Sequence, residues 1–283
     1  MSSTNASSST SSRSSNGVTM AVMTDPMPGT GAIIPHVVEV EARDDVRVVI
    51  EDGPWPVDPA LRAGGAEHLA ALRRRVPAMH DGPVLAMTSV AGGVVRARRA
   101  GYFDMVATAD ALAGNRALRA RATAMAGGDP LRRGDGRVAA IGLSVAATLP
   151  SGRVLLGRRR AELPLDPGAW HVVPSGMLEP EPGPIAAAVA REGLEELGMA
   201  VDPATVRMLG LGWDLVRLRP EVCVALALEA VPGRAGGDEF DMVEAFAGDR
   251  PPSPLTAGAA CALALLAGAC RRNERRSSPL SRG

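Results

Sequence analysis

The alternation of apolar and polar residues predicts an α+β arrangement in the first part of the chain. Residues 36–42 and 46–51 alternate apolar and charged positions on either side of a short polar turn, which predicts a β-hairpin. Residues 59–76 carry leucines at the spacing of an amphipathic helix, and residues 116–126 predict another helix. Between them, residues 83–97 predict two short strands around an Ala-Gly-Gly turn.

The second part of the chain contains apolar runs that predict paired strands. Residues 139–149 form an apolar run that ends in a Pro-Ser-Gly turn signal, and residues 153–160 return as a second strand. Together these two runs predict a hairpin. Further strands are predicted at residues 206–218 and 222–230, separated by Arg219-Pro220-Glu221.

A strand, a loop and a helix follow one another in the middle of this second part. Residues 170–179 have a strand-like pattern that is broken by Pro174-Ser175-Gly176. Pro184 suits the first turn of a helix, because its missing N–H costs no hydrogen bond there. Good or tolerable helix formers follow, and Gly198 lies where a left-handed C-terminal cap is expected.

Three glutamates on the predicted helix give the strongest chemical signal of the chain. Residues 191–198 read Arg-Glu-Gly-Leu-Glu-Glu-Leu-Gly, so the glutamates at 192, 195 and 196 project from one helix face. Their charges repel, and a hard divalent cation such as Mg²⁺, which binds carboxylate oxygens, would offset the repulsion. The alternative is a solvated acidic helix face, which is what most charge runs are.

The loop and helix together resemble the Nudix box, the signature of the Nudix hydrolases. The family pattern is Gly, a spacer, Glu, a second spacer, and then Arg-Glu-apolar-any-Glu-Glu-any-Gly-apolar. Gly176 resembles the opening glycine. The more specific closing half is matched by Arg191, Glu192, Glu195, Glu196, Gly198 and Met199.

Two departures from the Nudix pattern affect the loop and the helix. The interval from the opening glycine to Arg191 is one residue longer than the pattern allows, and Gly183 stands where the first Glu belongs, with Glu179 and Glu181 close by. Gly193 replaces the usual apolar residue, at a cost of about 1 kcal/mol relative to Ala in a helix interior. Because the extra residue falls in a loop, we expect the metal-binding helix to be intact.

The resemblance implies a fold and a division of the chain. It implies an α/β (α+β) Nudix fold, an α/β/α sandwich with a mixed sheet, at residues 134–270, preceded by a small α+β N-terminal domain at residues 28–130. Residues 257–270 are apolar, too few to span a bilayer, and predict a packed terminal helix. We expect residues 1–27 to be a disordered Ser-rich tail and residues 271–283 a flexible Arg-rich tail.

The activity implied by the resemblance is metal-dependent hydrolysis. Nudix hydrolases cleave a phosphoanhydride bond in a nucleoside diphosphate linked to a second group, using Mg²⁺ or Mn²⁺ to activate water. By this resemblance Glu195 and Glu196 are the main metal ligands, and Glu192 completes the metal site or orients the water as a base. Arg191 holds the carboxylates in place as part of the catalytic set. The backbone carbonyl of Ser175 is implied as a further metal ligand.

Substrate contacts are implied less directly. Arg158, at the end of a predicted strand, matches a position where the family often places a phosphate-contacting Arg, and an exposed strand-end charge is the alternative. Trp213 could stack on a nucleobase. The alternative is a place in the core, because the buried aromatic residues of a chain with so few of them are more often core residues. Glu239 lies where some relatives supply an additional acidic ligand or base. The segment around Tyr102 weakly resembles the UDP-glucose pyrophosphatase branch, and its alternative role is to anchor a small core.

Charge and cysteine content limit the classes of partner and the cellular location that we expect. Acidic and basic residues balance at 31 each, so no global field directs the chain to nucleic acid or to a membrane. Cys223, Cys261 and Cys270 have no metal-ligand spacing and lie in apolar segments, which predicts reduced thiols and a cytoplasmic protein. The expected partner is a nucleotide-derived small molecule, and the resemblance adds a homodimer, because Nudix proteins often dimerise.

An alternative hypothesis keeps the fold without strong catalysis. A catalytically weak Nudix-fold protein could bind a nucleotide as a sensor and use residues 36–130 to report occupancy. The missing first Glu favours this alternative, whereas the intact Arg-Glu and Glu-Glu pairs favour a hydrolase. The order of strand, glycine loop, helix and later strands argues against a third possibility, an unrelated α/β protein with a chance acidic helix.

Overall fold

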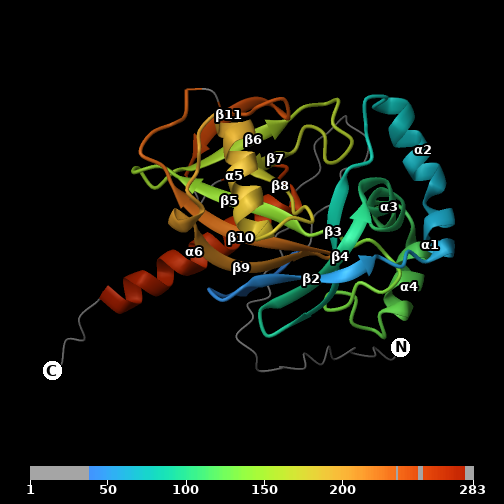
Figure 1. The fold of residues 1–283 in the computed structure, drawn as a ribbon. Coiled ribbons are helices and arrows are strands. Elements are labelled where there is room, and N and C mark those ends of the chain that lie inside the picture. Colours follow the sequence, from blue (N-terminus) through green and yellow to red (C-terminus); the bar gives the residue numbers. More distant parts are fainter. Residues whose placement is uncertain (1–37, 234, 248–250, 278–283) are drawn as a thin grey trace, which may run out of the picture.

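The computed structural model describes residues 38–233, 235–247 and 251–277, and Figure 1 shows how their elements are arranged. The expected Ser-rich tail at residues 1–27 lies outside the described residues. Among the helices that are described, none combines the length and the apolar character needed to cross a membrane.

The larger of two sheets has eight strands, whose main path runs β1-β9-β10-β5-β6-β11. Strand β7 branches from β6, and β8 branches from β5. The strands are β1 (Val38–Ala42), β5 (Gly142–Thr148), β6 (Val154–Arg159), β7 (Trp170–Val172), β8 (Ser175–Met177), β9 (Arg207–Asp214), β10 (Arg219–Ala227) and β11 (Phe240–Phe246). Strand β10 is parallel to β5 and the other pairs are antiparallel, so the sheet is mixed.

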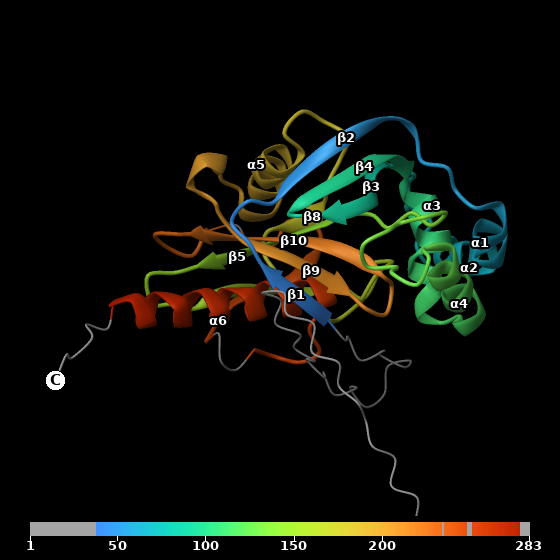
Figure 2. The ribbon, with the colours of Figure 1, turned by 90° about the horizontal axis from the view of Figure 1, so that it is seen from below.

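Helices α5 (Pro184–Leu197) and α6 (Ala257–Ser277) cover opposite faces of this sheet, as Figure 2 shows. Side chains alternate between the two faces along β5. Leu143 and Val145 belong to the core cluster that contains α5 residues, and Ala146 belongs to the cluster that contains α6 residues. Strand β5 is therefore buried on both faces, and the result is an α/β/α sandwich.

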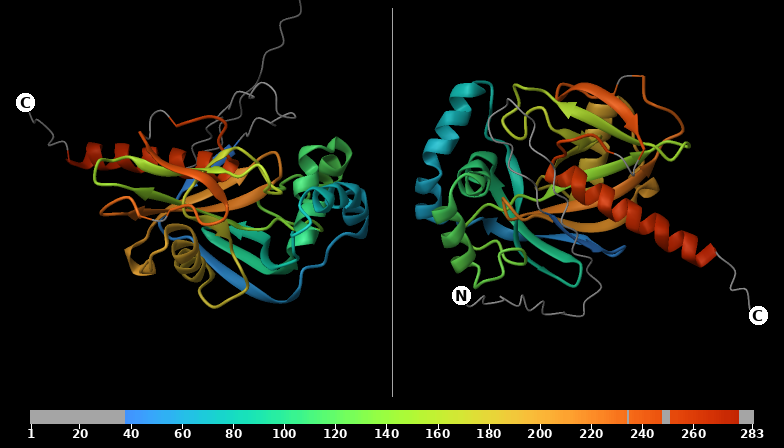
Figure 3. Two further views of the ribbon diagram at one scale, coloured as in Figure 1. Left: turned by 90° about the horizontal axis from the view of Figure 1, so that it is seen from above. Right: turned by 180° about the vertical axis from the view of Figure 1, so that it is seen from behind.

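A three-stranded sheet and four helices precede the sandwich. The sheet has the order β2-β4-β3, with β2 (Arg47–Pro54), β3 (Pro83–Ala91) and β4 (Val94–Gly101). The helices are α1 (Pro59–Gly64), α2 (Ala66–Arg75), α3 (Tyr102–Thr108) and α4 (Arg116–Met125), and two 3-10 turns are η1 (Asp110–Ala113) and, after α5, η2 (Pro203–Thr205). Figure 3 shows the four helices grouped on one side of the molecule, away from the C-terminal end of α6.

Backbone hydrogen bonds join the three-stranded sheet to the sandwich. The N–H of Leu85 donates to the carbonyl of Leu178 at 2.8 Å, and the N–H of Ile141 donates to the carbonyl of Leu85 at 2.9 Å. The N–H of Met87 donates to the carbonyl of Ala139 at 2.9 Å. Leu85 and Met87 lie in the same buried core cluster as α5 residues. The first part of the chain therefore packs directly on the sandwich and can share a cavity with it.

The hairpin predicted at residues 36–51 is wrong. Strand β1 pairs with β9 in the larger sheet, whereas β2 pairs in parallel with β4 in the smaller one. An alternating pattern identifies a strand and its buried face, but it does not specify the partner strand. As a result, β1 belongs to the larger sheet although it lies within the N-terminal unit that we predicted.

Most other predicted elements are present with shifted ends. The hairpins β3-β4 and β5-β6 are confirmed. The helix predicted at residues 59–76 is divided at Gly65, where an added Cβ would collide with the backbone of Ala107. The turn between β9 and β10 falls at residues 215–218 instead of 219–221, which places residues 219–221 inside β10. Helix α6 is longer than predicted and includes part of the expected Arg-rich tail.

Candidate functional site

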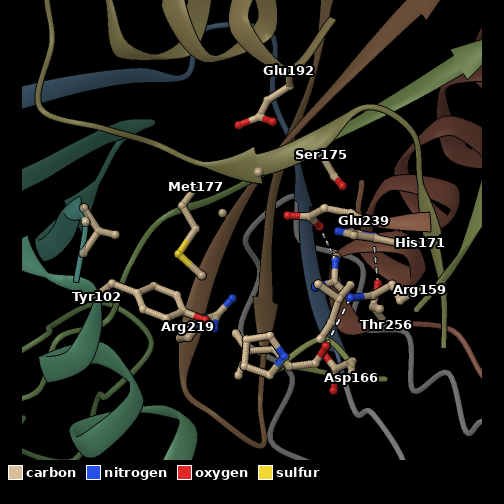
Figure 4. A pocket seen from close by; sticks show the side chains of 18 of the residues that line it. Tyr102, Arg159, Asp166, His171, Ser175, Met177, Glu192, Arg219, Glu239 and Thr256 are labelled. Atoms are coloured by element: carbon tan, nitrogen blue, oxygen red, sulfur yellow. Dashed lines mark hydrogen bonds and ion pairs between the residues drawn. The ribbon is translucent and has the colours of Figure 1, made fainter. Parts of the chain in front are cut away.

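A cavity of about 550 Å³ lies where the first part of the chain meets the sandwich. Its wall includes the loop before β3, Tyr102 of α3, strand β8, helix α5 and the first residues of α6. Figure 4 shows Tyr102 of α3, Met177 of β8 and Glu192 of α5 around the cavity. Residues that are far apart in the sequence therefore meet in one site, whose volume is within the range of small-molecule pockets.

Helix α5 brings two of the three predicted carboxylates, Glu192 and Glu195, to the wall of this cavity. The helix begins with Pro184 after Gly183, which has a left-handed φ of 62°, and ends at Gly198 with a left-handed φ of 65°. Glu192 and Glu196 are one turn apart and point into the protein, so they are only 8 % and 3 % exposed. The third glutamate, at position 195, is exposed and lines the cavity together with Glu192.

The Glu192 carboxylate is held between Gly176 and Arg191. An added Cβ on Gly176 would collide with the Glu192 carboxylate, so only glycine leaves room for it at this position of β8. Arg191 donates to Glu192 Oε1 at 3.2 Å. Burial raises the pKa of Glu192 to about 7 although Arg191 opposes the shift, and the charges of Glu195 and Glu239 raise it further. Figure 4 shows Glu192 pointing from α5 toward β8.

Glu196 is the more deeply buried of the two carboxyls. The backbone N–H of Ser175 donates to Glu196 Oε2 at 2.9 Å, which ties helix α5 to the start of β8. Burial raises the pKa of Glu196 well above its usual value, and the charges of Glu239 and Glu192 raise it further. Two buried carboxyls whose pKa values are raised by burial and by neighbouring carboxylates indicate a local deficit of positive charge.

Arg191 connects the loop after β8 to the helix. Its guanidinium donates to Glu181 at 2.8 Å and to the backbone carbonyl of Met177 at 3.0 Å, besides its bond to Glu192. Glu179 lies 3.5 Å away as a further ion-pair partner. Glu181, which the sequence pattern left out of register, therefore reaches Arg191 in space.

Glu239 enters the cavity from the segment before β11. Its carboxylate accepts from Arg159 Nη1 at 3.0 Å, and both residues line the cavity. The charge of Glu239 raises the pKa of Glu192 and of Glu196, so it lies close to both. The structure thus adds Glu239 to the carboxylates of the box.

The donor atoms around Glu192 suit a hard divalent cation. They are carboxylate oxygens, which Mg²⁺ and Mn²⁺ prefer, and the raised pKa values show that a cation would relieve their repulsion. The Oγ of Ser175 is buried without a hydrogen-bond partner. Within the residues that the structure describes, no three Asp, Glu, His or Cys side chains converge closely enough to hold a metal ion. The carboxylate oxygens are therefore the right type of ligand for such an ion, but the described side chains do not converge on one ion position.

An ion-pair network supports the wall of the cavity. Arg217 donates to Asp110 at 2.6 Å, to Asp166 at 2.7 Å and to Asp214 at 3.1 Å. Asp110 also lies 2.7 Å from His68 Nε2. Because Asp110 comes from η1, Asp166 from the loop after β6 and Asp214 from β9, this network fastens the first part of the chain to the sandwich.

The structure does not place Trp213 or Arg158 on the cavity. Trp213 is fully buried in the core and the guanidinium of Arg132 lies 3.9 Å above its ring, so the prediction that it stacks on a nucleobase is wrong. An alternating strand pattern could not show that this side chain faces the interior. Arg158 is exposed and pairs with Asp241 at 2.9 Å, whereas the next residue, Arg159, lines the cavity.

Sequence reasoning missed a second polar group in the same cavity. Arg219 and Glu221 line it from β10, and Tyr102 lines it from α3. The sequence pattern had placed Arg219 and Glu221 in a turn, where charged residues need no explanation. Their position next to a long apolar strand was the one available signal, because a charged residue inside a buried strand usually has a partner or a function.

Comparison with known proteins identifies a related domain family. Residues 139–253 match the NUDIX domain. This range lies inside residues 134–270, over which the sequence resembles Nudix proteins, and it includes β8 and α5. No curated protein matches the chain.

Several solved structures have similar folds over less than half of this chain. The MutT protein from Methanosarcina mazei Go1 is 19% identical, with 48% of this chain and 95% of that chain covered and a TM-score of 0.39. The MutT NUDIX hydrolase from Burkholderia pseudomallei is 28% identical, with 45% and 97% covered and a TM-score of 0.36. The NUDIX domain of Shewanella oneidensis NrtR, solved as a complex with ADP ribose, is 16% identical, with 46% and 88% covered and a TM-score of 0.38.

Proposed function

Because this chain contains a NUDIX domain at residues 139–253, we propose that it is a metal-dependent hydrolase of nucleoside diphosphate derivatives. The reaction is cleavage of a phosphoanhydride bond in a nucleoside diphosphate linked to another moiety. The observation that carries the proposal is the buried carboxyl of Glu192, which lines a cavity large enough for a nucleotide, with the buried carboxyl of Glu196 one helical turn further along α5. Carboxyls buried without sufficient positive charge are typical of functional sites.

The proposed cofactor is Mg²⁺ or Mn²⁺. Glu192, Glu195 and Glu196 would hold it, together with the backbone carbonyl of Ser175. When bound, such an ion neutralises phosphate charge and lowers the pKa of a bound water, which a phosphoanhydride needs because its negative charge repels hydroxide.

The side chains of the protein have separate tasks in this proposal. Arg191 fixes the Glu192 carboxylate through the 3.2 Å hydrogen bond, and the Ser175 N–H fixes Glu196 at 2.9 Å. Arg159, which already orients Glu239 at 3.0 Å, supplies a cation on the cavity wall for the substrate phosphates. Arg159 takes the phosphate-contacting role that the sequence had assigned to Arg158.

The test is phosphate release from a panel of nucleoside diphosphate conjugates, measured after phosphatase coupling with Mg²⁺ or Mn²⁺. The panel should contain nucleotide sugars, ADP-ribose and dinucleoside polyphosphates. Wild type is compared with Glu196→Gln, which keeps an acceptor for the Ser175 N–H, and with Glu244→Gln, which changes an exposed carboxylate of β11. We expect metal-dependent turnover that Glu196→Gln lowers by at least roughly 100-fold, with no change in Glu244→Gln. Turnover without divalent metal, or equal turnover in all three proteins, would contradict the proposal.

A second candidate is a nucleotide-binding sensor with weak catalysis. It is favoured by the absence, among the described residues, of three metal-ligating side chains that converge, and by Gly183 at the position of the first box Glu. Nucleotide binding with no turnover on any member of the panel would support the sensor. The cytoplasmic location and the homodimer stay predictions in either case.

A further inference from the structure

A further buried carboxyl, Glu221, lines the cavity on the other side of the sheet from Glu192. Glu221 is 8 % exposed and its Oε1 accepts from the hydroxyl of Ser144 at 2.6 Å. Cys223 follows Glu221 by two positions on β10, and Ala146 follows Ser144 by two positions on β5, so they share the face of the sheet on which Glu221 lies. Both belong to the core cluster that contains α6 residues. Gly176, against which Glu192 sits, pairs with Leu143, which packs with α5. The cavity therefore has carboxyls on both faces of the sheet.

Two glycines make room for the Glu221 carboxyl. An added Cβ on Gly142 would collide with Glu221 Oε2, and an added Cβ on Gly258 would come within 2.8 Å of Oε1. Gly142 is opposite Glu221 in the sheet and Gly258 is in the first turn of α6. The surroundings thus accommodate a carboxyl at this position, which the hydrolytic steps proposed above do not use.

Arg219 stands beside Glu221 as an unpaired donor. The two residues are separated by one position on β10, so their side chains project from the same face. Arg219 Nε is buried without a hydrogen-bond partner among the described residues. Its guanidinium otherwise makes one weak contact, with the sulfur of Met105 at 3.5 Å. A charged donor with unused hydrogen-bonding capacity therefore lines the cavity next to an acceptor.

The ring of Tyr102 completes this group. Burial raises the pKa of Tyr102 to about 12, and the nearby charge of Arg219 opposes the shift. Figure 4 shows the Tyr102 ring next to Arg219. An aromatic face, a guanidinium and a carboxyl on the wall of one cavity are the groups that proteins use to bind an unstacked nucleobase.

We propose that Tyr102, Arg219 and Glu221 form the nucleobase subsite, and that the preferred base has a ring N–H beside a carbonyl oxygen, as guanine and uracil do. This inference rests on the proposed function, because it names the part of the substrate that lies away from the phosphates. Glu221 accepts from the ring N–H and Arg219 donates to the carbonyl oxygen. Adenine and cytosine have an unprotonated ring nitrogen instead, whose lone pair repels the Glu221 oxygen.

The experiment is calorimetric titration with GDP, UDP, ADP and CDP at pH 8 in EDTA, so that Glu221 is ionised and binding is measured without metal and without turnover. Wild type is compared with Glu221→Gln, which keeps an acceptor for Ser144, and with the exposed control Glu244→Gln. We expect GDP and UDP to bind wild type more tightly than ADP and CDP. Glu221→Gln should weaken GDP and UDP binding by roughly 5- to 150-fold, the range for one paired base contact. Arg219→Gln provides a second variant with the same expected result.

Equal affinity for the four nucleotides, a preference for ADP or CDP, or unchanged selectivity in both variants would overturn the nucleobase subsite. The turnover assay is separate from this measurement. Selective binding without metal-dependent turnover would overturn the hydrolase and support the subsite. Metal-dependent turnover with unselective binding would overturn the subsite alone.

Discussion

Replacing Glu221 by Gln should stabilise the protein at alkaline pH while it weakens nucleotide binding. Burial raises the pKa of Glu221 from 4.5 to about 7, with the Ser144 hydrogen bond and the charge of Arg219 opposing the shift. Between pH 4.5 and 7, the folded protein therefore keeps a proton on Glu221, whereas the unfolded chain has released it. In this window the wild type loses stability as pH rises, because the unfolded state binds fewer protons.

The raised pKa of Glu221 sets how much stability the wild type loses at alkaline pH. The rise in pKa from 4.5 to about 7 corresponds to a loss of about 3 kcal/mol in the free energy of unfolding, at 1.36 kcal/mol per pKa unit, which is complete above pH 7. Glu221→Gln removes the titration and keeps the acceptor for Ser144, so at pH 8 its melting temperature should be higher by roughly 5–10 °C. Below pH 4.5 the two proteins should melt together.

Thermal unfolding in EDTA, followed by circular dichroism from pH 4 to pH 8.5, measures this difference directly. Glu244→Gln, at an exposed position of β11, serves as the control and should change stability by no more than about 0.5 kcal/mol at any pH. A wild type that is as stable as Glu221→Gln at pH 8, or a difference that does not depend on pH, would contradict a raised pKa of Glu221 in the folded protein. Either result would mean that the buried carboxyl is compensated when it is ionised.

Three further substitutions test other parts of the structure. Gly176→Ala adds a Cβ against the Glu192 carboxylate and should lower kcat by roughly 10-fold or more, whereas Gly114→Ala, which has open space, should not; equal kcat values would contradict the packing seen at β8. Arg217→Met leaves three carboxylates without their guanidinium, so urea unfolding should show a loss of roughly 3–5 kcal/mol, and no loss would show that the network is dispensable. Trp213→Phe should lower the free energy of unfolding by roughly 1–3 kcal/mol and leave KM unchanged, because the indole is buried; a raised KM would return it to the substrate site.

Local sequence spacing was sufficient to predict the acidic helix and its glycine loop. Glu192 and Glu196 are one helical turn apart, so their common direction follows from helix geometry alone. The hairpins β3-β4 and β5-β6 were predictable for the same reason, since each turn lies between adjacent strands. Whether these carboxyls were exposed or buried could not be predicted, because their burial depends on β8 and on the first part of the chain.

The remaining parts of the site depend on pairings that are distant in sequence. Glu221 enters the cavity because β10 pairs with β5, and Gly142 then stands opposite it. Tyr102 reaches the same cavity because β3 forms hydrogen bonds with the segment before β5. The errors have the same origin: the partner of β1 lies far along the chain in β9, and the inward orientation of Trp213 follows from that pairing and from β10.

The most direct measurement of the central claim is a Mn²⁺ titration in which free Mn²⁺ is followed by electron paramagnetic resonance and turnover is recorded in the same samples. Wild type is compared with Glu192→Gln and Glu196→Gln. We expect saturable Mn²⁺ binding in the wild type, turnover that rises with the fraction of protein that has bound Mn²⁺, and the loss of both in each variant. Turnover that persists in EDTA, or Mn²⁺ binding that is unchanged in both variants, would contradict the assignment of these buried carboxyls to a hydrolytic metal site.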